Sequence, residues 1–346
     1  MHQSLSYNRI EGEAAKNYKM QRYYSSLLVL ESAQKEGIFC KGRGWQISFE
    51  PNPSSHVITG GEPAKEIVIY AQTEGRAQYV VDMILAAHCL YTGEILTFDR
   101  LPVFLGRAQT IKERVEQIMA GGGRSIAVYD LPVSCLIAAK ASRKNIYQYA
   151  IFKYLLSCRT VPLGARSLDP QGDWEPGRVI SALPEEHVFN ANAITLAYSV
   201  LEELSFDMRA SSEVPSRING RWNPIVREDL QERLTNAGIN ISEPILWHLR
   251  ETPTRIERMR KPPSSGKCEW AGYKVRDEYL DIIEAIAYAS WLRSKVSAHR
   301  ASVLTKSLTV CDVANVQHLS RRLLLEALGF WRYHEAGARN TNADKS

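Results

Sequence analysis

The feature that most constrains the fold is an apolar stripe with helical spacing between residues 275 and 296. Apolar side chains recur there at alternating steps of four and three residues, which is the spacing of one buried face of an amphipathic helix. The stripe consists of Val275, Tyr279, Ile282, Ile286, Ala289, Arg293 and Val296. Arg293 breaks the apolar pattern, and a buried charge is costly unless it is paired or lines a cavity. This conflict makes Arg293 the best functional lead in the sequence.

Helical patterns dominate the chain, so we predict a mainly α protein. A stretch rich in proline and glycine divides the sequence into two parts. We expect an N-terminal mixed α/β, mostly helical domain at residues 1–165, a linker at 166–184, a C-terminal helical domain at 185–333 and a disordered tail at 334–346. The N-terminal domain would sense a signal or regulate the C-terminal domain.

Local patterns predict the individual elements. Alternating or β-rich runs predict strands at residues 45–49 and 66–70. Capping residues and apolar periodicity predict helices at residues 1–35, 76–90, 110–119 and 132–158, after Pro184, after Asn223-Pro224, at 275–296 and after a capping box at 309–312.

Composition excludes several protein classes. The 346 residues are 45% hydrophobic and 23% charged, which is typical of a globular protein. The most apolar stretch, residues 79–91, is too short to cross a membrane, and residues 1–15 do not resemble a secretion signal. Six scattered cysteines without metal-ligand spacing indicate reduced thiols, no structural metal site and a cytoplasmic protein. We expect no cofactor.

The net charge of +5 is concentrated in residues 140–169, where six basic residues face Asp169 alone; the rest of the chain holds 37 basic and 37 acidic residues. Tyrosine and phenylalanine are interleaved with the basic residues. Such a pattern suits a polyanion such as nucleic acid, and it also suits a solvated helix face with its aromatic rings turned inward.

Arg293 and His299 supply two of the groups that metal-independent RNA cleavage needs. A base removes the proton of a 2′-hydroxyl, an acid protonates the leaving oxygen, and a cation offsets charge on the phosphate. Histidine titrates near neutrality, and arginine binds phosphate oxygens in a bidentate fork. The two residues are six positions apart, about 9 Å and about 240° on an ideal helix, so a shared site requires a helix end or a second chain.

Two stretches resemble the C-terminal half of a HEPN domain. They are LRSKVSAHR at residues 292–300 and SLTVCDVANVQHLSRRLLLEAL at residues 307–328. The signature of that family is an arginine, four to six residues and a histidine at the end of a core helix, and Arg293 and His299 match it with five residues between. The resemblance covers residues 185–333 and implies a HEPN-like α-helical bundle.

Many HEPN domains are metal-independent ribonucleases that form one composite site in a homodimer and act in bacterial anti-phage defence or toxin–antitoxin systems. The resemblance therefore implies a catalytic set of Arg293, His299, Ser294 and Glu203, an RNA substrate, and an antitoxin or phage-derived trigger as partner. Active members often carry Asn, Asp or His after the arginine, where this chain has Ser294. His318 is a reserve acid–base group. We expect RNA to be bound by Arg143, Lys144, Lys153, Arg255, Arg258, Arg260 and Arg300.

Other interpretations remain open. Arg293 can instead be a structural, partly buried arginine that pairs with Glu202, Glu203 or the end of a helix. The chain would then be a non-enzymatic module that dimerises or binds a nucleotide, RNA or a protein. Residues 140–166 could also form a sequence-specific nucleic-acid binder, but they contain no recognisable helix-turn-helix.

Overall fold

The computed structural model describes most of the predicted elements. The described residues are 20–30, 38–51, 64–97, 100–105, 112–113, 116–117, 126–161, 184–219, 221–249, 276–297, 308 and 310–331. Residues 166–183 of the predicted linker and the predicted tail lie outside them. Of the predicted helix at 110–119, only residues 112–113 and 116–117 are described, and these are helical.

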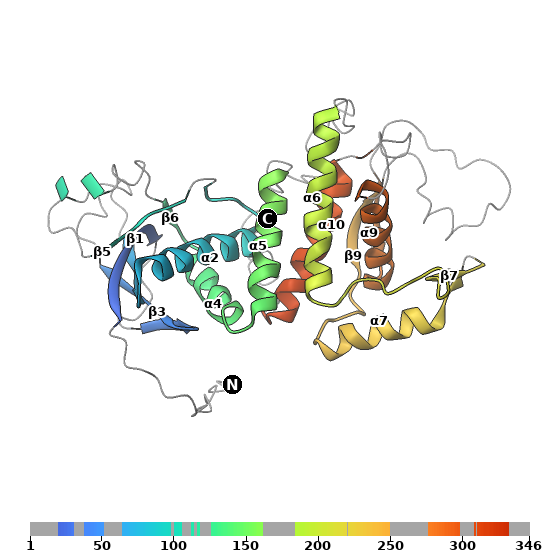
Figure 1. The fold of residues 1–346 in the computed structure, drawn as a ribbon, viewed down its shortest axis with the longest axis horizontal. Coiled ribbons are helices and arrows are strands. Elements are labelled where there is room, and N and C mark those ends of the chain that lie inside the picture. The colour runs from blue at the N-terminus through green and yellow to red at the C-terminus, as the bar shows by residue number, and fades with distance from the viewer. Residues whose placement is uncertain are drawn as a thin grey trace, which may run out of the picture.

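A six-stranded sheet forms the N-terminal part (Figure 1). Its strands are β1 (Gln21–Leu30), β2 (Ile38–Gly42), β3 (Trp45–Pro51), β4 (Ala64–Ala71), β5 (Val103–Leu105) and β6 (Ile126–Val128). The first five pair antiparallel in the order β2-β3-β4-β1-β5, and β6 runs parallel to the second half of β1. The expectation of a mainly α protein is therefore wrong, because the fold is mixed.

Strand β1 corrects the prediction of a helix at residues 1–35. All seven side chains from Tyr23 to Val29 are buried, since β1 lies in the interior of the sheet with neighbours on both sides. A strand that is buried on both faces reads as a continuous apolar run, which periodicity cannot distinguish from a buried helix. The strands predicted at residues 45–49 and 66–70 are confirmed as β3 and β4.

One helix lies between β4 and β5 in the chain, and two helices follow β6. Helix α2 (Glu74–Thr92) confirms the prediction for residues 76–90, and it begins with Thr73 as its cap. The single helix predicted at residues 132–158 is instead two, α4 (Leu131–Ala141) and α5 (Asn145–Thr160). The chain turns at Ser142, whose hydroxyl donates to the Ala139 carbonyl (2.8 Å) and accepts from the Arg43 N–H (3.0 Å).

The C-terminal part combines helices with two small hairpins, so it is not a pure α-helical bundle. The helices are α6 (Pro184–Glu203), α7 (Pro224–Asn236), α9 (Ile282–Ser297) and α10 (Val310–Ala327). The hairpins are β7 (Arg217–Ile218) with β8 (Arg221–Trp222), and β9 (Ile245–Leu249) with β10 (Arg276–Leu280). The predicted starts at Pro184 and at Asn223-Pro224 are confirmed, with the Asn223 side chain accepting from the Ile225 N–H.

The helix that carries Arg293 begins later than the stripe predicts. Residues 276–280 form strand β10, and Tyr279 is 69% exposed instead of facing the core. Asp281 ends the strand and accepts a hydrogen bond from the Glu284 N–H at 2.8 Å, so the helix starts at Ile282. Ile282, Ile286 and Ala289 are buried as the stripe predicts.

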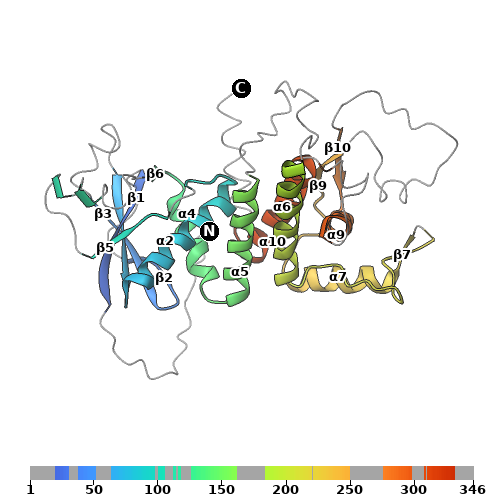
Figure 2. The same ribbon diagram turned by 45° about the horizontal axis from the view of Figure 1, so that its top comes forward.

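Helices α5, α6 and α10 join the two parts of the molecule. Both views show α5 beside α6, with α10 crossing behind them (Figures 1 and 2). Buried residues of the sheet, α2, α5, α6, α9 and α10 belong to one hydrophobic cluster. The predicted domain boundary falls between two helices that share this core. None of the helices in the described ranges is long and apolar enough to span a membrane.

Candidate functional site

Arg293 lies in the last described turns of α9 and faces the end of α6. Its guanidinium is 3.1 Å from a carboxylate oxygen of Glu202, and the two side chains are 43% and 38% exposed. An ion pair this exposed is worth about 0–1 kcal/mol, because water screens the charges. Glu202 therefore faces Arg293 through a weak ion pair that water screens.

The neighbouring carboxylate, Glu203, points to a different helix. Its oxygen accepts a hydrogen bond from the Lys153 ammonium on α5 at 2.5 Å, with both side chains about 30% exposed or less. Adjacent residues on a helix point about 100° apart, so α6 contacts α9 through Glu202 and α5 through Glu203. Lys153, which the sequence assigns to RNA, and Glu203, which it assigns to catalysis, are thus partners of each other.

Neighbouring side chains pack α9 firmly around Arg293. Ser294 is exposed, and its hydroxyl donates to the Trp291 carbonyl at 2.8 Å. Tyr288 contacts Trp291 and the fully buried Trp247, with ring centroids 5.9 and 5.1 Å apart. Edge-on aromatic packing of this kind holds the helix in one position, so the Arg293 backbone is fixed while its side chain remains accessible.

Several predicted site residues lie outside the described residues. These are His299, Arg300, Arg255, Arg258 and Arg260. Arg143 and Lys144 are described; both are exposed at the turn between α4 and α5. The structure therefore places five of these residues on the neighbouring helices α9, α6 and α5: Arg293, Ser294, Glu202, Glu203 and Lys153. Arg143 and Lys144 lie elsewhere, immediately before the N-terminus of α5.

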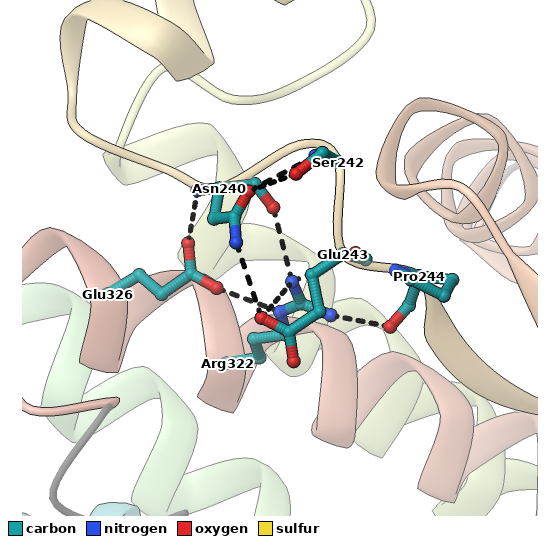
Figure 3. A network of polar contacts seen from close by, with 6 residues as sticks. All are labelled: Asn240, Ser242, Glu243, Pro244, Arg322 and Glu326. Carbon is teal, nitrogen blue, oxygen red and sulfur yellow. Dashed lines mark hydrogen bonds and ion pairs between the residues drawn. The ribbon is translucent and has the colours of Figure 1, made fainter.

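Sequence analysis missed a buried ionic network around Arg322 on α10 (Figure 3). The Arg322 side chain is 3% exposed, and its Nε donates to Glu326 at 2.8 Å. Its two other nitrogens donate to backbone carbonyls of Pro244 (2.8 Å), Asn240 (3.2 Å) and Glu243 (3.0 Å). The loop before β9 is thus tied to α10. The available signal was a charged residue within an otherwise buried helix, the same signal that identified Arg293.

A second missed network holds the start of α9. Arg217 of β7 and the indole N–H of Trp222 both donate to the carboxylate of Glu284, at 2.5 and 2.6 Å. The Arg217 guanidinium also lies 4.5 Å from the Trp222 ring centroid. Glu284 is 8% exposed, so these contacts offset the cost of burying its charge. Their role is to position α9, on which Arg293 lies two turns or more further along.

A histidine and several cysteines are buried in the core. His88 is 2% exposed, and burial lowers the pKa of its imidazole to about 4. All five cysteines in the described ranges are buried thiols outside any disulfide, and burial raises the pKa of Cys40 to about 12. Among the described residues, no group of three or more His, Cys, Asp or Glu side chains is placed to hold a metal ion.

We compared the chain with known proteins and found no relative. No protein-family model, curated protein or solved structure matches this chain. The resemblance to HEPN domains stays a prediction from the residues quoted above.

Proposed function

We propose that this protein is a metal-independent endoribonuclease of the HEPN type, in which Arg293 binds the phosphate at the cleavage position. The observation that carries the proposal is the placement of Arg293: its side chain is 43% exposed, lies on a helix that aromatic rings pack firmly, and forms a surface ion pair with Glu202. A planar, permanently charged fork in such a position suits bidentate contact with a phosphodiester.

The chemistry is an internal transesterification. The 2′-oxygen attacks the adjacent phosphorus as a base removes its proton, and the bond to the 5′-oxygen breaks as that oxygen takes up a proton. The products are a 2′,3′-cyclic phosphate and a 5′-hydroxyl end. His299 supplies the base or the acid, and a homodimer supplies the second histidine. Ser294 and Glu202 orient the arginine, and Glu203 acts from α6 through its pairing with Lys153.

The proposed setting is the bacterial cytoplasm, in anti-phage defence or a toxin–antitoxin pair. In that setting an antitoxin or a phage-derived trigger controls the nuclease. A cell that expresses the unrestrained enzyme stops growing because its RNA is cut.

The test expresses the wild type and the variants Arg293→Ala, Arg293→Lys and His299→Ala in bacteria and follows growth and RNA integrity. Purified proteins are then incubated with RNA with and without EDTA. We expect cleavage that EDTA does not inhibit and that Arg293→Ala or His299→Ala reduces at least about 100-fold. Arg293→Lys keeps the charge but loses the bidentate geometry, so its cleavage rate should lie between those of the wild type and Arg293→Ala. Intact RNA, or cleavage that survives both alanine substitutions in folded protein, would contradict the proposal.

A second candidate is a non-catalytic interaction module, which the ion pairs Arg293–Glu202 and Lys153–Glu203 favour. In this case the two pairs serve only to hold α9 and α5 against α6. Arg293→Ala would then change stability by no more than about 1 kcal/mol and leave RNA untouched, whereas dimerisation or partner binding would persist.

A further inference from the structure

A second surface lies where the β2–β3 turn, the first turns of α2 and the α4–α5 junction meet. We define this basic–aromatic surface by Arg43, Arg76, Arg143, Lys144, Tyr79 and Tyr149. Arg43, Arg143, Lys144 and Tyr149 are exposed, and Arg76 and Tyr79 are partly exposed. Only Arg143 and Lys144 belong to the basic segment visible in the sequence; the other two cations arrive from segments that are distant in the chain.

Hydrogen bonds hold the three segments together. The Arg43 N–H donates to the Ser142 hydroxyl at 3.0 Å, and the Arg76 guanidinium donates to the Arg43 carbonyl. The Tyr79 hydroxyl donates to the Gln148 side chain, whose amide donates to the Ser142 carbonyl at 3.0 Å. The backbone beneath the cations is therefore fixed before any ligand binds, which lowers the entropic cost of binding.

The positive charge of this surface is not neutralised within the described part of the chain. Arg43, Arg76, Arg143 and Lys144 form no ion pair with a described carboxylate. The three segments, residues 41–44, 73–79 and 140–149, hold six cationic side chains and a single carboxylate, Glu74. Burial lowers the pKa of the neighbouring Lys140, and the charge of Arg143 lowers it further. Such mutual repulsion is relieved by a polyanion.

Aromatic rings accompany the cations. The Arg76 guanidinium carbon lies 4.9 Å from the Tyr79 ring centroid, and the Lys144 ammonium lies 5.6 Å from that of Tyr147. Tyr149 is 62% exposed, which leaves a face of its ring open to solvent. Bases of a single strand stack on tyrosine rings and on guanidinium planes, whereas the bases of a duplex are already stacked on one another.

We propose that the basic–aromatic surface binds single-stranded RNA, with the cations contacting phosphates and Tyr149 stacking on a base. This deepens the proposed function, since it names the binding site of its RNA substrate, but it does not depend on cleavage. Lys153 is not part of the surface because Glu203 already pairs with it. The expected role of Arg143 and Lys144 thus extends to Arg43 and Arg76, which the sequence did not indicate.

The test measures binding of a fluorescently labelled 2′-O-methyl oligonucleotide of about 20 nucleotides by anisotropy, because this strand has no 2′-hydroxyl to cleave. The variant carries Arg43→Glu, Arg143→Glu and Lys144→Glu. Its matched control carries Arg209→Glu, Arg221→Glu and Arg227→Glu, three exposed arginines of the C-terminal part. We expect the variant to bind at least about tenfold more weakly than the wild type. The slope of its log binding constant against log salt concentration should be smaller in magnitude by about 2. The control should keep an affinity and a slope near those of the wild type.

A second arm tests stacking. Tyr149→Ala should weaken binding roughly tenfold and Tyr149→Phe should retain it, because the phenyl ring still stacks. An RNA duplex of the same sequence should bind more weakly than the single strand. The proposal is overturned if the wild type does not bind, if both triple variants lose affinity equally, or if polyglutamate competes as well as the oligonucleotide, which would indicate an acidic protein as partner. If the wild type binds the oligonucleotide but does not cleave RNA, the proposed ribonuclease activity is contradicted and the proposed binding surface is not.

Discussion

At the scale of single residues, burial decides what an arginine does in this protein. Arg322 and Arg293 both lie on helices of the C-terminal part, but Arg322 is 3% exposed and Arg293 is 43% exposed. The donors of Arg322 are distributed over one carboxylate and three carbonyls, so its charge is compensated within the protein. Arg293 keeps nearly half its surface for solvent or a ligand. The same type of side chain is therefore enclosed in the protein on α10 and accessible to solvent on α9.

Truncating Arg322 should destabilise the protein strongly. In Arg322→Ala, the Glu326 carboxylate (6% exposed) loses the guanidinium that it faces at 2.8 Å, and breaking a buried pair in this way costs about 3–5 kcal/mol. Urea denaturation followed by circular dichroism measures the loss. Arg227→Ala removes an exposed arginine of α7 and should stay within about 0.5 kcal/mol of wild type. Equal effects of the two substitutions would show that the network contributes nothing.

His88 should make stability depend on pH. Burial lowers its folded-state pKa to about 4, below the ordinary value of 6.5, so protonation favours the unfolded chain. The contribution of neutral His88 is complete above pH 6.5 and is lost as the pH falls from 6.5 towards 4. Between pH 7.5 and pH 5 the loss is about 2 kcal/mol, since one pKa unit corresponds to about 1.4 kcal/mol.

Comparison with His88→Asn isolates this effect, because asparagine can keep a hydrogen bond to Ser134, whose hydroxyl lies 3.3 Å from His88 Nδ1. Urea denaturation of both proteins at pH 7.5 and pH 5 gives the difference. The substituted protein should lose less stability over this interval. A parallel decline of both proteins would assign the pH dependence to carboxylates instead.

At the scale of elements, the hairpin of β2 and β3 is fitted closely to the α4–α5 junction. A Cβ atom added at Gly42 would lie 2.1 Å from the Trp45 ring and 2.6 Å from the Ser142 hydroxyl. Trp45 is 1% exposed, so its ring has no free space into which to move. Glycine is needed at position 42 because the hairpin, the ring and the junction meet there.

Gly42→Ala should therefore destabilise the protein by about 3 kcal/mol, the upper part of the range for overpacking a core. Gly75→Ala is the matched control, because its Cβ would meet no atom within 4 Å and it lies in the first turn of α2. That substitution should be neutral or stabilise the protein by up to about 1 kcal/mol through helix propensity. Thermal unfolding of both variants measures the difference, and a tolerated Gly42→Ala would refute the close fit.

The same elements show how far the sequence predicts the structure. Caps and amphipathic periods located α2, α6 and α7, because those signals are local. Strand β1 was missed because a run buried on both faces carries no period. The break at Ser142 was missed, and one of its contacts, the hydrogen bond from the Arg43 N–H, joins residues 99 positions apart. For the site, pattern and charge identified Arg293 but left Glu202, Glu203 or a helix end as its partner, and the structure pairs it with Glu202. The role of Arg43 and the carbonyl partners of Arg322 could not be predicted, since the contacting groups come from segments distant in the chain.

At the scale of the whole molecule, α10 connects the two parts. Arg321 of α10 donates to the carbonyls of Leu90 (2.8 Å) and Tyr91 at the end of α2. These are carbonyls that a helix leaves without a partner at its C-terminus, and a cation there also compensates the helix dipole. On its other sides α10 contacts α5, α6 and the hairpin strand β9. The N-terminal sheet and the C-terminal helices are thus coupled through α10 in addition to the packing of α5 on α6.

This coupling predicts that both parts unfold together. In native-state hydrogen exchange with increasing urea, amides of residues 67–69 in β4 and residues 323–325 in α10 should converge on one opening free energy. Arg321→Ala leaves the α2 carbonyls unpaired and should lower both values equally, by about 1–3 kcal/mol. Arg227→Ala should leave both unchanged. If α10 opened with a free energy several kcal/mol below that of β4, or if Arg321→Ala affected only one of them, the two parts would be independent domains, and a signal received by the N-terminal sheet could not reach Arg293 through α10.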